Sequence, residues 1–129
     1  MLNDLFKLYT CIYPAATKRA LMPNVNRAVI MGVLGKDPEV KSFGNGSSIA
    51  TFSVATSQHW KDKNTGERKE QTEWHRIVVQ GRLVDVVSKY LKKGGKVYVE
   101  GSLHTRKWKD TKGNDRETVE VKARELQLL

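Results

Sequence analysis

The chain has few residues that could form a disulfide or hold a metal ion. Cys11 is the single cysteine among 129 residues, so no disulfide can form within one copy of the chain. His59, His75 and His104 are scattered, and without a second cysteine they show no zinc-ligand spacing. We therefore expect no bound metal and no cofactor.

Long apolar runs are also missing. No segment approaches the roughly 20 apolar residues needed to span a bilayer, so we expect no membrane-spanning part. The chain is long enough for one core of ordinary size and too short for two. We therefore expect a single domain, and the single cysteine indicates a chain that is cytosolic or indifferent to redox state.

The chain has fewer acidic than basic residues. Asp and Glu total 14 against 23 Lys and Arg, which gives a net charge of +9. This balance indicates a polyanionic partner or an anionic surface. It does not indicate an enzyme, because we find no nucleophile–base spacing and no glycine-rich phosphate loop. Glu70, Glu73 and His75 are the nearest approach to an acid–base group, but a nuclease would need a metal site that the sequence does not provide.

Tryptophan occurs where charge is densest. In residues 58–80, Trp60 and Trp74 stand where a charged loop meets two strand-like segments, and Trp108 lies in the basic run 106–109. Single-stranded nucleic acid offers bases that stack on indole and phosphates that attract Lys and Arg. The alternative is that Trp74 is an ordinary core residue of a strand.

Residues 1–21 differ from the rest of the chain, because no strand or turn pattern appears before Val25. Three interpretations compete: a disordered extension, a targeting segment, or a start codon assigned upstream of the real one at Met22. Asp4 and the scarcity of arginine count against a transit peptide, and the apolar run is too broken for a secretory signal. We favour the extension or the start-codon artefact, with one domain over residues 22–129.

From Val25 onward the pattern predicts β-structure with one helix. Apolar residues at helical spacing predict the helix over residues 81–91. Alternating apolar residues and glycine-rich turns predict five strands. The first covers residues 25–43 and is interrupted by a turn at residues 35–38. The other four cover residues 48–57, 72–80, 96–108 and 117–128. Three strands, a helix and two strands form the order of a five-stranded OB-fold barrel, with the helix between strands 3 and 4.

Several motifs in this order resemble the bacterial-type single-stranded DNA-binding protein, the type also found in mitochondria. They are residues 26–30, 32–39, 51–56, 70–76, 90–94 and 97–101, within a match over residues 25–128. The resemblance implies an OB-fold that assembles as a homotetramer and wraps single-stranded DNA around itself. We expect a cytoplasmic, nucleoid-associated bacterial protein, with a mitochondrial location as the less favoured alternative.

The same resemblance assigns roles to individual residues. Trp60, Trp74 and Trp108 match base-stacking positions. His75 and Tyr98 match positions at subunit contacts. Basic residues match positions of phosphate contact, and these are Lys61, Lys63, Lys69, Arg76, Arg106 and Lys107.

Two features depart from the family pattern. Gln80 occupies a position where the family often has an aromatic residue, so we expect one stacking platform fewer and lower affinity. Bacterial members continue into a long linker with an acidic tail that recruits replication and repair enzymes, whereas this sequence stops at Leu129. Either the sequence is truncated or it is a tail-less variant of the mitochondrial or the phage and plasmid kind, and we expect no recruitment through a tail.

The function predicted from the sequence is sequence-independent binding and protection of single-stranded DNA in replication, recombination and repair. Two alternatives remain open. One is a tail-less OB-fold component of a primosome or an RNA-binding protein, which matched DNA and RNA oligonucleotides would distinguish. The other is a protein-interaction scaffold whose charge is only a solvated surface, which replacement of the tryptophans would distinguish.

Overall fold

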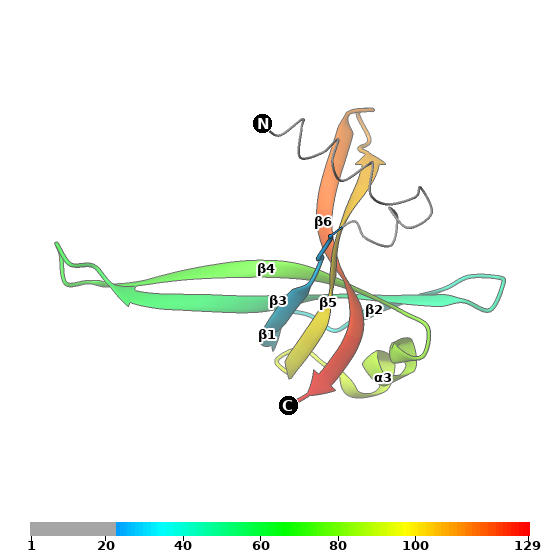
Figure 1. Cartoon of the computed structure of the whole chain (residues 1–129), viewed down its shortest axis with the longest axis horizontal. Coiled ribbons are helices and arrows are strands. Elements are labelled where there is room, and N and C mark those ends of the chain that lie inside the picture. The colour runs from blue at the N-terminus through cyan, green and yellow to red at the C-terminus, as the bar shows by residue number, and fades with distance from the viewer. Residues whose placement is uncertain (1–22) are drawn as a thin grey trace, which may run out of the picture.

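The computed structural model describes residues 23–129, so the predicted extension over residues 1–21 lies outside the described residues. Within the described residues, six strands and one helix follow in chain order (Figure 1). They are β1 (Ala28–Leu34), β2 (Glu39–Ser42), β3 (Ser48–Lys61), β4 (Arg68–Gln80), α3 (Leu83–Tyr90), β5 (Lys96–Lys109) and β6 (Asp115–Leu128).

The strands form one sheet that closes on itself. Their order is β1-β5-β6-β4-β3-β2, and β1 also pairs with β3 through Val33 and Ala55. Because this second pairing of β1 joins the two sides of the sheet, the result is a barrel, with β2 as an additional strand beside β3. The predicted OB-fold barrel is confirmed.

The strand count differs from the prediction in one respect. The predicted first strand becomes β1 and β2, because the turn at residues 35–38 separates two segments that pair differently. β1 pairs with β5 and β3, whereas β2 pairs only with β3. If β1 and β2 are counted as one strand, α3 lies between the third and fourth strands as predicted.

Alternation along the strands builds the core. Val97 and Val99 of β5 and Ile77 and Val79 of β4 are fully buried, while their neighbours point outward. The helix α3 contributes Val84 and Val87 and covers one end of the barrel, together with Leu91 just after it. The rest of the buried apolar set is Ile30, Leu34, Ala50, Phe52, Val54 and Val121.

Barrel closure requires close contact between β1 and β3. A Cβ atom on Gly32 of β1 would lie 2.2 Å from the carbonyl oxygen of Ala55 and 2.8 Å from Val54 Cγ1. No side chain fits between these backbones, so glycine at this position allows β1 to cross from β5 to β3.

Hairpins project beyond the barrel, and in the β3–β4 hairpin the strands run farther than the sequence predicts. Residues 58–71 were expected as a loop, but β3 runs to Lys61 and β4 begins at Arg68, in register as a pair. The residues are charged yet extended, because the antiparallel ladder satisfies their backbone groups while their side chains stay in water. We call residues 57–72 the arm; it projects from one side of the barrel in Figure 1, and the β5–β6 hairpin projects from another.

Candidate nucleic-acid interface

One face of the barrel presents aromatic and basic side chains from β4 and β5, with polar side chains of β6 between them. β6 lies between β5 and β4 in the sheet. Because Ile77 and Val121 are paired and both point into the core, the residues beside them point outward together. We call this surface the outer face; its residues are Trp74 and Arg76 of β4, Arg106 and Trp108 of β5, and Thr118 and Glu120 of β6.

Trp74 is on the surface and not in the core. Its side chain is 59% exposed. A Cβ atom on Gly35 would lie 2.3 Å from Cζ3 of the indole, so the ring rests on the glycine backbone of the turn between β1 and β2. The indole is thus held on one side and open on the other, which is the arrangement that stacking on a base requires.

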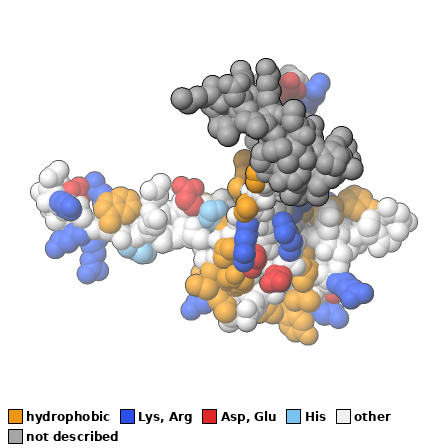
Figure 2. Space-filling model, in the orientation of Figure 1, with side chains coloured by type: hydrophobic (Ala, Val, Ile, Leu, Met, Phe, Trp, Pro, Cys, Tyr) orange, Lys and Arg blue, Asp and Glu red, His pale blue; other side chains and the backbone are white. Residues whose placement is uncertain are grey.

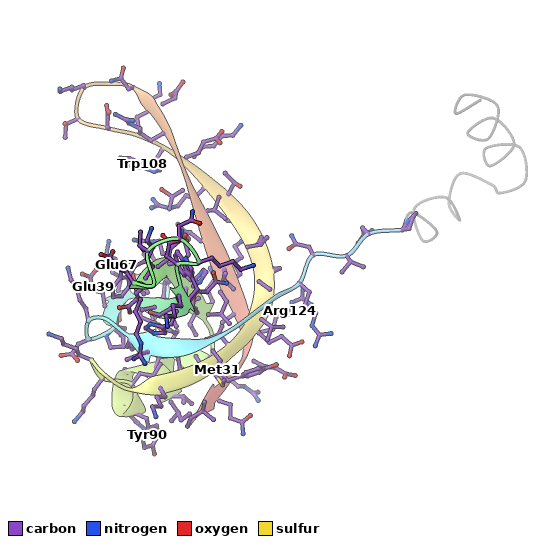
Figure 3. The ribbon with its side chains drawn as sticks, turned by 90° about the vertical axis from the view of Figure 1, so that its left-hand side faces the viewer. Met31, Glu39, Glu67, Tyr90, Trp108 and Arg124 are labelled. Carbon is purple, nitrogen blue, oxygen red and sulfur yellow. The ribbon has the colours of Figure 1, made fainter. Side chains whose placement is uncertain are left out.

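Trp108 is held by a hydrogen bond instead. Its Nε1 donates to Thr118 Oγ1 across the β5–β6 pair at 2.8 Å, and the residue is 40% exposed. Figure 3 shows Trp108 on the concave side of the curved hairpin, the side from which the arm projects toward the viewer. The bond satisfies the indole N–H and fixes the plane of the ring, while the ring surface remains available.

Trp60 lies elsewhere, on the arm. It is 46% exposed and pairs with Lys69, whereas Trp74 pairs with Ala55. In this register the two tryptophans point to opposite sides of the β3–β4 ribbon. The structure therefore brings Trp74 and Trp108 onto one face and places Trp60 on a separate surface.

The arm carries most of the predicted lysines. Lys61 and Lys63 are exposed, and Figure 2 shows basic side chains gathered toward the far end of the arm. Lys69 differs, because its Nζ lies 3.0 Å from Asp62 Oδ2. The backbone N–H of Asn64 and the Lys69 ammonium lower the pKa of Asp62, so this carboxylate stays charged and orders the turn.

Arg76 and Arg106 share one acidic partner. Glu120 is 5% exposed, and its Oε1 lies 2.5 Å from Arg106 Nε and 3.6 Å from Arg76 Nε. Lys107 points to the opposite side of the hairpin from Arg106, across from Glu117. Sequence reasoning missed Glu120; its signal in the sequence was an acidic residue set between Val119 and Val121 in the last strand.

The two predicted interface residues lie away from the outer face. His75 points inward and its Nε2 lies 2.8 Å from Thr56 Oγ1. Tyr98 pairs with Met31 of β1, and its hydroxyl donates to Glu100 Oε2 at 3.3 Å. Partial burial and the negative charge of Glu100 raise the pKa of the Tyr98 hydroxyl.

A strip of apolar side chains lies beside Tyr98 on the outside of β1. Val29 is 53% exposed, Met31 63% and Val33 39%. These residues alternate along one strand and point away from the core, as Met31 in Figure 3 shows. Gln80, where the family often has an aromatic residue, is exposed at the end of β4.

Among residues 23–129 no three His, Cys, Asp or Glu side chains lie close enough together to hold a metal ion. Within the same range no helix is long and apolar enough to cross a membrane.

Comparison with known proteins adds two findings. Residues 25–129 match the model of the single-strand binding protein family. A structure described as a Plasmodium falciparum SSB in complex with ssDNA is 41% identical and superimposes with a TM-score of 0.76. That match covers 84% of this chain and 97% of the Plasmodium chain. The family match includes the whole outer face, the arm and β1.

Proposed function

Because the chain belongs to the single-strand binding protein family, we propose that it binds and protects single-stranded DNA without selecting a base sequence. Roles in replication, recombination and repair are typical of the family. The same membership supports a binding role in preference to catalysis. The Plasmodium protein of similar fold was solved with single-stranded DNA, which supports the same ligand here.

One observation carries the proposal: Trp74 and Trp108 present open indole surfaces on the face that also presents two arginines. Every base has a π-face, so stacking on tryptophan tolerates any sequence, and contacts to phosphate do not read sequence directly. Duplex DNA hides its bases and loses the stacking contribution. Selectivity for the single strand therefore follows from the same residues that provide affinity.

A fluorescence titration tests this proposal. Oligo-dT is expected to quench the tryptophan emission strongly, because stacked bases contact exposed indoles, whereas a duplex of equal length is expected to quench it weakly. Oligo-U of matched length tests the RNA-binding alternative. Equal quenching by single strand and duplex, or none by either, would contradict the proposal.

We include assembly into a homotetramer in the proposal. The exposed strip Val29, Met31 and Val33 beside Tyr98 supports it, because a contiguous apolar surface of this kind gains free energy when a second copy covers it. Light scattering should then give a mass about four times the 14.6 kDa of one chain. Met31→Lys is expected to lower that mass, and a wild-type protein of single-chain mass would refute the assembly.

A further inference from the structure

Glu120 is the one charged or polar residue counted as buried in the described part of the chain. A carboxylate out of water costs free energy unless cations and hydrogen bonds replace its hydration. The burial of Glu120 is unexpected, because this side chain points outward from the barrel and not into the core. Arg76 and Arg106 both contact its carboxylate, and these two cations compensate for part of the lost hydration.

The topology makes this arrangement possible. β6 is the middle strand of three, so a side chain on it can reach both neighbours. Glu120 lies opposite His104 of β5 and one residue before Val121, which pairs with Ile77 of β4. One carboxylate oxygen thus connects arginines that are 30 residues apart in the sequence.

Each arginine approaches the carboxylate through Nε. A guanidinium has five N–H donors, and contact through Nε leaves the four Nη donors for another acceptor. No further hydrogen-bond or ion-pair partner of Arg76 or Arg106 is found within residues 23–129, and their side chains are 45% and 47% exposed. Two positive charges against one negative charge leave a net positive charge on the outer face.

We propose that Glu120 is a positioning residue, which holds Arg76 and Arg106 in the orientation that binds the phosphates of a single strand between Trp74 and Trp108. This inference rests on the proposed function. Arginine loses much rotamer freedom when it is fixed at an interface. Glu120 restricts both side chains before DNA arrives, so less of that freedom remains to be lost on binding.

The decisive experiment is Glu120→Gln, because two physical effects predict opposite results. Removing a negative charge from a surface that binds a polyanion should tighten binding if charge alone matters. If Glu120 positions the arginines, the same change weakens binding to oligo-dT by about tenfold. The measurement is the anisotropy of a labelled oligonucleotide, with thermal unfolding recorded for each variant.

Glu117→Gln is the matched control. Glu117 lies three residues earlier on β6, is exposed, and has no ion-pair partner within the described residues. The Glu117→Gln substitution removes the same charge as Glu120→Gln, and we expect it to leave the affinity for oligo-dT unchanged or slightly tighter. Glu120→Asp provides a second variant: it keeps the charge but shortens the side chain, so weaker binding again indicates a requirement for position.

A variant that lacks both arginines distinguishes the positioning role from a purely structural role, in which Glu120→Gln would weaken binding even without the arginines. If Glu120 acts through the arginines, Glu120→Gln has less than about a twofold effect when Arg76 and Arg106 are both already glutamine. Unchanged or tighter binding by Glu120→Gln, with wild-type protein binding normally, would overturn this inference and leave the proposed function intact. If the wild-type protein itself fails to bind, the proposed function is wrong.

Discussion

Replacing Trp60, Trp74 and Trp108 together with alanine is expected to lower the affinity for single-stranded DNA at least a hundredfold. One stacked base contributes roughly 1–3 kcal/mol, so three lost platforms cost at least about 3 kcal/mol. All three side chains are between 40% and 59% exposed, so their loss leaves no cavity in the core. The fold is therefore expected to remain while binding is lost.

The triple variant keeps none of the three tryptophans of the chain, so quenching of tryptophan emission cannot report binding and anisotropy of a labelled oligo-dT is the suitable measurement. Tyr90→Ala is the matched control. Tyr90 is 66% exposed at the end of α3, and Figure 3 shows it at the opposite end of the molecule from Trp108. An equal loss of affinity in the control, or retained affinity in the triple variant, would show that exposed tryptophans do not carry binding.

Single replacements separate the contributions. Trp74 and Trp108 share the outer face, so one strand can contact both, and each replacement should cost the full contribution of a stacked base. Trp60 lies on the arm and points to the other side of the ribbon from Trp74. A ligand too short to reach the arm should therefore bind Trp60→Ala as tightly as it binds the wild type.

Local patterns were sufficient to predict the barrel and its helix. The helix over residues 81–91 was predicted from apolar spacing alone, and the structure places it at Leu83–Tyr90. β-Strands with one buried side show strict alternation, which is why β5 was predicted from its starting residue Lys96 onward. These features are encoded within a dozen consecutive residues, so no knowledge of distant contacts is needed.

Features that depend on distant residues were not predictable in this way. The arm looked like a loop because it is charged, yet pairing between β3 and β4 keeps it extended. Gly35 contacts the indole of Trp74 although the two residues are 39 positions apart, and the sequence around neither residue indicates this contact. The contacts of Glu120 depend on which strands flank β6, and strand order is set by the closure of the whole barrel.

Affinity is also expected to fall steeply with salt. Each neutralised phosphate of a single strand contributes about −0.7 to the slope of log affinity against log salt. Asp62 offsets the charge of Lys69, and Glu120 offsets one of the two arginines, which leaves about four effective cations of the six predicted. For an oligonucleotide that fills one barrel, the slope is then about −3, so affinity falls about fiftyfold between 50 and 200 mM salt.

Lysine replacements on the arm test the assignment of these cations. Lys61→Ala combined with Lys63→Ala should reduce the magnitude of the slope by about 1.4, because two phosphates are no longer neutralised. Lys89→Ala, an exposed position on α3, is the control and should leave the slope unchanged. If the arm variant keeps the wild-type slope, the strand does not follow the arm, and the outer face with its two arginines carries the electrostatic part of binding alone.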